Sequence, residues 1–212
     1  GLFLEKALWN PLRKKGAGLV SFLIISMGVA LTIRNSMIAI FGGSHQYFDL
    51  PAQSRIQFMG VSLGKYDLII IVVSIIAMVA FHYILQKTTL GKSMRALSDS
   101  TDLARISGIN VDRVILGMWV IVMALTGLAG SLYGVVTTVR PAMGFNLLLP
   151  IFAATILGGI GSIHGAMIGG MILGISEELS TMFIPTEYKM AVAFVILLIV
   201  ILIKPKGLFR GI

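Results

Sequence analysis

Long apolar stretches alternate with short polar ones along almost the whole chain. A helix rises about 1.5 Å per residue, so roughly 20 apolar residues are needed to cross a hydrocarbon layer about 30 Å thick. About six stretches approach this length, and they cover residues 17–41, 67–86, 114–138, 146–162, 165–183 and 189–203. Only a glycine-containing turn at 161–165 separates the fourth from the fifth, which predicts a tight helical hairpin. The pattern therefore predicts an all-α fold, a polytopic transmembrane helical bundle.

The composition excludes a soluble globular protein. Of the 212 residues, 57% are hydrophobic and 12% are charged, whereas soluble domains carry about 25% charged residues. The absence of Cys excludes a disulfide framework, a thiol nucleophile and a Cys-ligated metal. The net charge of +8 is typical here of cytoplasmic loops beside anionic membrane lipid, and no nucleic-acid partner is expected.

The basic residues predict the orientation in the membrane. Twelve of the 17 Lys and Arg residues lie in 1–16, 87–113 and 204–212. Lys and Arg are held on the cytoplasmic side during insertion, and an even number of spans places these three stretches on one side. We therefore predict that both ends and the 87–113 loop are cytoplasmic. The 42–66 loop is then periplasmic, and we expect it to be neither a spanning helix nor a regular strand but a surface for an external partner.

The first residues are interpreted as a connecting segment. The chain begins with Gly1 and not with Met, and residues 1–16 lack the pattern of a signal peptide. We interpret 1–16 as a cytoplasmic loop that follows an earlier span. Residues 1–212 are predicted to form a single transmembrane domain, a fragment lacking its N-terminal helices.

The long cytoplasmic loop contains signals for a short helix. Ser98 or Asp99 can cap the start of a helix over 102–106, and Gly108 suits the left-handed conformation that ends one. Asn110 is expected to cap the next span. On periodicity alone, a short amphipathic helix here can lie on lipid, stiffen the loop or dock into a partner.

The same loop carries a family resemblance. Asp102-Leu103-Ala104, followed by three residues and Gly108, resembles the Glu-Ala-Ala-x-x-x-Gly motif of bacterial ABC importer permeases, with the first two positions changed. The chain also resembles the branched-chain amino acid permeases, in order, at 11–13, 34–35, 89–96, 108–113, 157–170, 187–189, 193–194 and 204–209. The resemblance covers nearly the whole chain, strongly from residue 89 onward and weakly over 42–66.

The resemblance implies a multi-pass permease subunit in the bacterial inner membrane. Such a subunit translocates branched-chain amino acids or similar small polar solutes by alternating access. The implied partners are a second permease subunit, identical or different, two cytoplasmic ATPase subunits, a periplasmic or lipid-anchored substrate-binding protein, and membrane lipid. The chain itself is expected to be no enzyme and to bind no cofactor, because the partner subunits use the ATP. The expected ATPase-coupling residues are Arg95, Asp102, Leu103, Ala104, Arg105 and Gly108.

Glycines recur at helical spacing in two of the predicted spans and in the hairpin turn. Small residues four positions apart stack on one helix face and let helix backbones approach closely. The residues expected to act in this way are Gly130, Gly134, Gly161, Gly165, Gly169, Gly170 and Gly174. A nucleotide-binding loop is excluded, since it requires Gly-Lys-Ser/Thr after the glycines and Ser162-Ile163-His164 follows instead.

Four polar residues lie within the predicted spans. Arg34 and Asn35 fall in the outward part of the first, and Glu177 and Glu178 in the outward half of the fifth. An ionisable group in hydrocarbon is costly unless it is paired or faces water. Three interpretations stay open: pairing between spans, a translocation path that meets the ammonium and carboxylate of an amino acid, or snorkelling to the interface.

Two other classes of function remain as alternatives. An ion- or proton-coupled secondary transporter is expected to show a chain of Asp, Glu or His through its spans, and only Glu177 and Glu178 qualify. A structural membrane subunit agrees with the composition but leaves the capped cytoplasmic helix unexplained. The histidines His45, His82 and His164 are scattered, so no metal site is expected.

Overall fold

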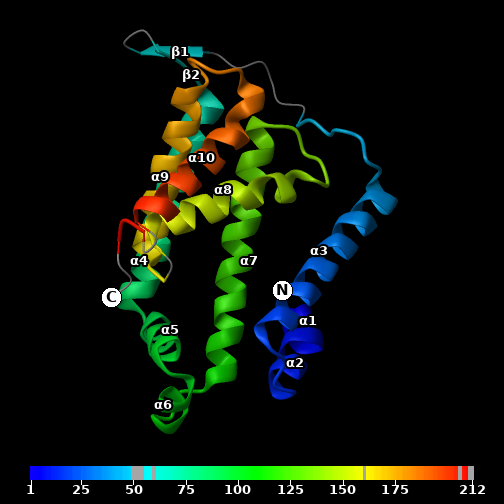
Figure 1. The fold of residues 1–212 in the computed structure, drawn as a ribbon, viewed down its shortest axis with the longest axis vertical. Helices are drawn as coiled ribbons and strands as arrows, with labels where there is room; N and C mark the ends of the chain where they lie inside the picture. Colours follow the sequence, from blue (N-terminus) through cyan, green and yellow to red (C-terminus); the bar gives the residue numbers. More distant parts are fainter. Residues whose placement is uncertain (49–54, 59–60, 160, 205–206, 210–212) are drawn as a thin grey trace. The chain divides into compact units, whose positions relative to one another are not determined.

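A computed structural model describes residues 1–212 except 49–54, 59–60, 160, 205–206 and 210–212. The chain divides into two compact units, Gly1–Arg140 and Pro141–Ile212. Helices make up nearly all the regular structure of both units (Figure 1). The predicted all-α helical membrane fold is confirmed.

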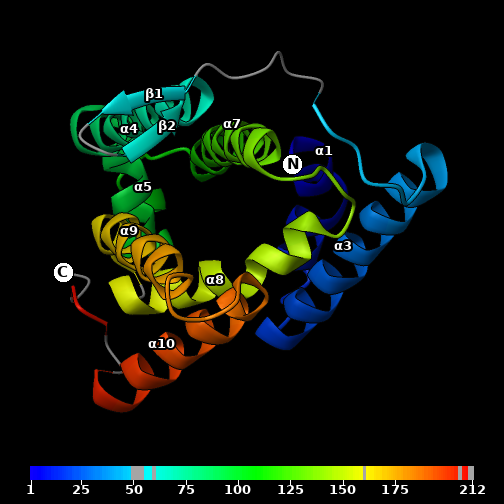
Figure 2. The same ribbon diagram turned by 90° about the horizontal axis from the view of Figure 1, so that it is seen from above.

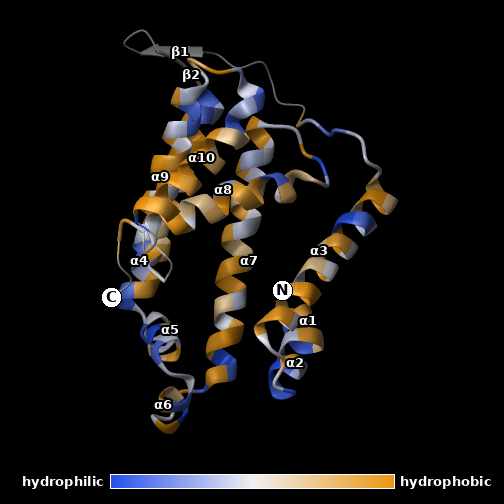
Figure 3. Cartoon of the chain, in the orientation of Figure 1, coloured by the Kyte–Doolittle hydropathy of each residue, from blue (hydrophilic) through white to orange (hydrophobic). Residues whose placement is uncertain are grey.

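The first unit contains three long apolar helices at the predicted positions. They are α3 (Leu19–Phe41), α4 (Lys65–Lys87) and α7 (Val111–Val136). Two further helices, α5 (Thr89–Asp99) and α6 (Thr101–Ile106), connect α4 to α7. Contacts join α4 with α5, α5 with α7 and α4 with α7, so these three helices form one packed group. Figure 3 shows the long helices coloured mostly as hydrophobic, as expected of helices that face lipid.

The N-terminal segment is helical, so its prediction as a loop is wrong. Residues 2–14 form α1 (Leu2–Leu4), a π-helical turn η1 (Glu5–Trp9) and α2 (Asn10–Lys14). Pro11 lies in the first turn of α2, directly after the π-helical turn, and its ring fixes a φ that suits a helix. The segment is far shorter than a span, and it is stabilised by side chains of α7, which no local pattern reveals.

A short β-hairpin lies between α3 and α4. Strands β1 (Arg55–Phe58) and β2 (Val61–Gly64) are antiparallel, with Arg55 opposite Gly64. The prediction that 42–66 contains no regular strand is therefore wrong. The backbones of Gln46 and Val139 also exchange two hydrogen bonds, of 3.0 and 2.9 Å, which join the start of this loop to the segment after α7.

The second unit is a three-helix group with a core of small side chains. It consists of α8 (Met143–Gly158), α9 (Ile163–Ser180), a 3₁₀ turn η2 (Thr186–Tyr188) and α10 (Lys189–Ile203). All three helices contact one another, and they lie together in Figure 2. Ala153, Leu173 and Ala193 form the buried core, with exposed fractions of 0%, 3% and 0%. Ala153 of α8 and Ala193 of α10 have small side chains, which allow these helices to pack closely.

Four helical segments are long and apolar enough to cross a membrane among the described residues. They are α3, α4, α7 and the run Thr186–Ile203 that contains α10. The predicted fourth and fifth spans are present as helices but fall short of that standard. At 16 residues, α8 is about 24 Å long, and the 18 residues of α9 include two carboxylates. Four of the about six predicted spans therefore meet that standard in the described chain, the crossing of α8 and α9 stays a prediction, and a multi-pass membrane protein is supported.

Candidate functional site

A sharp elbow joins α4 to α5 at the start of the cytoplasmic loop. The Thr88 hydroxyl caps α5 by accepting a hydrogen bond of 3.1 Å from the Gly91 amide. A Cβ on Gly91 would lie 2.3 Å from the carbonyl oxygen of Leu85, so only glycine fits this turn. Arg95 of α5 donates a 3.0 Å hydrogen bond to the Gln86 side chain of α4. The structure thus places Arg95 at the elbow.

The sequence reasoning missed α5 altogether. Its signals are Thr88 at the cap position and apolar residues at Leu90, Met94 and Leu97, the spacing of one helix face. Leu90 packs against α7, where its Cδ1 lies 2.6 Å from the position that a Cβ on Gly117 would take. The missing side chain at Gly117 therefore lets α5 approach α7.

The predicted cytoplasmic helix exists as α6, with a different cap. Ser100 is extended, with φ −159°, and its hydroxyl accepts a 3.3 Å hydrogen bond from the Leu103 amide. Ser98 and Asp99, the predicted caps, lie in the last turn of α5. Both residues are part of α5 itself, so the chain breaks at Ser100, later than expected.

The end of α6 agrees with the sequence expectation. Gly108 has φ +80°, the left-handed conformation that glycine adopts without strain. Its amide donates to the Arg105 carbonyl, and the Ile109 amide donates to the Ala104 carbonyl, each at 3.0 Å. This pair of bonds is a Schellman motif. Asn110 then caps α7 by accepting 3.1 Å from the Arg113 amide, as predicted.

The side chains of α6 divide between an inner and an outer face. Ala104 is 3% exposed, whereas Leu103 and Ile106 are 66% and 83% exposed. Asp102 and Arg105 are exposed as well. The outer surface therefore presents two large apolar side chains, each next to or near a charged one, on a helix whose ends are both capped. Such a surface can bury apolar area in a complementary groove.

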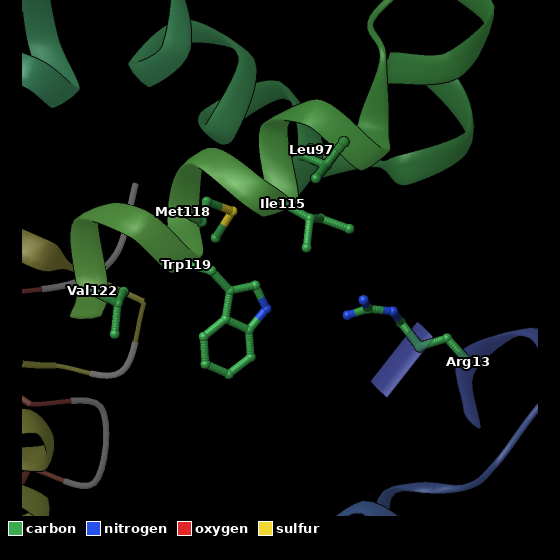
Figure 4. A pocket seen from close by; sticks show the side chains of 6 residues that line it. All are labelled: Arg13, Leu97, Ile115, Met118, Trp119 and Val122. Atoms are coloured by element: carbon green, nitrogen blue, oxygen red, sulfur yellow. The ribbon is translucent and has the colours of Figure 1, made fainter. Parts of the chain in front are cut away.

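A second site lies where the N-terminal segment meets α7. Glu5 is 4% exposed. Its Oε1 forms an ion pair with Arg13, which donates a hydrogen bond to it. Its Oε2 accepts a 2.6 Å hydrogen bond from the Trp119 indole N–H. Figure 4 shows Arg13 and Trp119 facing each other across a cavity of about 340 Å³, with Leu97 of α5 on its wall. Glu5 was not among the residues predicted from the sequence. Its one signal there is that it is the only acidic residue among the first 48.

The four polar residues predicted within the spans lie in different units. Arg34 and Asn35 belong to α3 of the first unit, and Glu177 and Glu178 to α9 of the second. Glu178 is paired with Lys189 at 2.6 Å, which links α9 to the start of α10. The Glu177 Oε1 is buried and has no hydrogen-bond partner within the described chain. Pairing between Glu177 and Arg34 stays a prediction.

The glycines divide into tight and open positions. A Cβ on Gly165 would lie 2.2 Å from the Gly158 carbonyl oxygen, and one on Gly134 would lie 2.9 Å from Val139. A Cβ on Gly170 would meet Ala154 at 4.0 Å, which is ordinary contact. Gly161, with φ +92°, lies in the hairpin turn and not on the helix face.

Two predicted packing positions are open. No described atom lies within 4 Å of a Cβ built on Gly130 or Gly174.

Within the part of the chain that the structure describes, no group of three or more His, Asp or Glu side chains is arranged to hold a metal ion.

Comparison with known proteins places these features in a family. The model of the family described as "Branched-chain amino acid transport system / permease component" matches residues 10–201. The chain is 34% identical to the high-affinity branched-chain amino acid transport system permease protein LivH of Escherichia coli K12, over 98% of this chain and 69% of that protein. It is 29% identical to the corresponding protein BraD of Pseudomonas aeruginosa, with the same coverage.

A ribose transporter is also similar over part of the chain. The ribose import permease protein RbsC of Escherichia coli K12 is 34% identical over 62% of this chain and 43% of that protein. No solved structure matches the chain.

Proposed function

Because the chain belongs to the branched-chain amino acid transport permease family, we propose that it forms the membrane path of an ABC importer for branched-chain amino acids. The family and the permease function agree with the resemblance in the loop and glycine motifs. The substrate class follows from the names of the relatives that cover 98% of the chain. ATP is hydrolysed by partner subunits, and this chain contributes no cofactor site.

The exposed apolar face of α6 carries the proposal of ATPase docking. Leu103 and Ile106, 66% and 83% exposed, belong to a helix that is capped at both ends and would gain from burial in a protein groove. Asp102 and Arg105 beside them supply charges that orient the partner. The Schellman turn at Gly108 and the Asn110 cap then connect α6 directly to α7, so a displacement of α6 is passed to a membrane-spanning helix.

The remaining parts of the transporter follow from the same proposal. The three stretches rich in Lys and Arg support a cytoplasmic location for both ends of the chain and for α6. A second permease subunit completes the path, and an external binding protein delivers the substrate to the opposite side. Glu177, whose buried Oε1 is unpartnered in the described chain, is our candidate for a group on the path or its gate.

Reconstitution of the full-length subunit tests the proposal. Expressed with its genomic neighbours and placed in proteoliposomes, it should co-purify with an ATPase and take up leucine only when ATP and a loaded binding protein are present. Ribose, the solute in the name of the partial relative RbsC, serves as the competing solute and should not reduce uptake.

Substitutions on α6 test the docking face. Changing Leu103 and Ile106 together to Ser should remove co-purification of the ATPase. The matched control is Met182→Ser, since Met182 is 75% exposed and lies outside the loop. Uptake driven by a proton gradient without ATP would favour a secondary transporter instead.

A further inference from the structure

The contact between Glu5 and Trp119 joins residues 114 positions apart in the chain. Glu5 lies in the π-helical turn, Arg13 in α2 and Trp119 in α7. Both carboxylate oxygens of Glu5 receive a donor, one from each partner. A buried carboxylate is stable only when it is hydrogen-bonded and paired, so removing either donor leaves a costly charge. We call Glu5, Arg13 and Trp119 the N-terminal junction.

The N-terminal junction lies close to the docking loop along α7. Trp119 follows the Asn110 cap by nine residues, about 13 Å along the helix, and α6 directly precedes that cap. Leu97 of α5 lines the same cavity as Arg13 and Trp119. The junction therefore includes a residue of α7, the helix that follows α6, and shares a cavity with α5, the helix that precedes α6.

The N-terminal segment continues directly into α3. Arg13 is six residues before Leu19, the first residue of α3, and α1, at the other end of the segment, contacts α7. A displacement of α7 is transmitted to α3 only if the segment stays attached. Gly1 also packs against Met123, and Phe3 and Lys6 line a surface pocket together with Val120 of α7. Glu5 is the buried residue of the segment and is bonded to α7 through its carboxylate, so it supplies the charged and hydrogen-bonded part of this attachment.

We propose that Glu5 is a positioning residue for transport: through Arg13 and Trp119 it makes the N-terminal segment move together with α7 when the docking loop moves. The inference rests on the proposed function. In the absence of this connection the ATPase still engages α6, but the movement reaches α3 incompletely and ATP is hydrolysed without transport. A purely structural Glu5 would instead change the amount of folded protein and leave the coupling ratio unaltered.

Uptake per ATP hydrolysed is the measurement that separates these roles. The assay uses the full-length transporter with its ATPases and binding protein in proteoliposomes. Trp119→Phe removes the indole donor and keeps an aromatic ring, and Glu5→Gln removes the charge. Each should lower leucine uptake per ATP by about tenfold, the size expected when a hydrogen bond to a buried charge is lost. Folded yield should stay measurable.

Trp9→Phe is the matched control. The Trp9 indole N–H is buried without a hydrogen-bond partner in the described chain, and its ring lies against Phe22 at 6.0 Å between centroids. The substitution makes the same chemical change on the same segment, and it should leave the coupling ratio unaltered. If Glu5→Gln fails to fold, Trp119→Phe gives the result in its place, because it removes one donor and leaves the ion pair of Glu5 with Arg13 intact.

A distance measurement tests the proposal independently of activity. The chain has no Cys, so spin labels can be placed at Lys14→Cys and Val120→Cys, both exposed positions. The distance between them should stay narrow with and without ATP in the wild type and broaden in Trp119→Phe. An unchanged coupling ratio and distance distribution in Trp119→Phe would overturn the inference. A wild-type complex without ATP-driven uptake would overturn the proposed function instead.

Discussion

The carbonyl oxygen of Ala154 lies 2.2 Å from the point that a Cβ on Gly169 would occupy. The backbones of α8 and α9 therefore meet at a distance that only glycine permits. Gly158 and Gly165 meet in the same way one turn nearer the hairpin. Close backbone approach through small residues is how apolar helices associate where burial from water supplies little driving force.

Gly169→Val should destabilise the second unit. The opposing atom is a backbone oxygen that cannot rotate away, so the helices must separate at a cost of roughly 1–3 kcal/mol. The thermal midpoint and folded yield in detergent should both fall. Gly174→Ala on the same helix is the control, because no described atom lies within 4 Å of its Cβ. Equal behaviour of the two variants would contradict this account of the packing.

Ser100→Ala should loosen α6. It removes the side-chain acceptor of the Leu103 amide, and loss of such a cap costs about 1 kcal/mol. Hydrogen exchange of the amides over 101–106 should accelerate by about fivefold. Ser98→Ala, in the final turn of α5, should have no comparable effect. Faster exchange in Ser98→Ala than in Ser100→Ala would show that Ser98, as predicted from the sequence, caps α6.

Gly108→Val should reduce ATP-driven uptake while membrane insertion persists. A β-branched residue resists the φ of +80° found at Gly108, so the Schellman turn that links α6 to α7 should open. Uptake per inserted transporter is the measurement. Gly108→Asn is the control, because Asn tolerates the left-handed conformation, and its uptake should remain near that of the wild type.

Glu177→Gln should lower uptake by about tenfold or more. A tenfold loss corresponds to a rise of about 1.4 kcal/mol in the activation free energy of one transport step. The substitution keeps the shape and removes the charge of a carboxylate with one buried, unpartnered oxygen. Uptake per folded transporter is compared with that of Glu178→Gln, whose exposed carboxylate is paired with Lys189. If Glu177 serves only as a counter-ion, folded yield should fall instead, and Arg34→Gln should restore it. Wild-type uptake at normal yield would remove Glu177 from the path.

Reporter fusions test the orientation. Fusions after residues 44, 100 and 203 should report the periplasm, the cytoplasm and the cytoplasm, because the loops rich in Lys and Arg stay inside. The position after residue 100 is the most informative, since it lies between α5 and α6. A periplasmic signal there would separate α6 from any cytoplasmic ATPase.

Properties that depend on neighbouring residues could be predicted from the sequence. Six apolar segments became helices, and α10 has the predicted bounds Lys189–Ile203, because a continuous apolar run specifies a buried or lipid-facing helix by itself. The Asn110 cap and the left-handed Gly108 were predictable for the same reason. Each involves a side chain and backbone groups no more than a few residues apart.

Properties that depend on distant residues appeared only in the tertiary structure. The N-terminal segment is helical against α7, and the buried Glu5 owes its stability to Trp119, 114 residues away. The hairpin of β1 and β2 needs paired backbones, and Gly165 and Gly169 are distinguished from Gly174 only by what the facing helix brings near them. A sequence pattern indicates which surroundings each residue prefers. Which residue then pairs with a buried charge or fills a gap depends on how the whole chain packs.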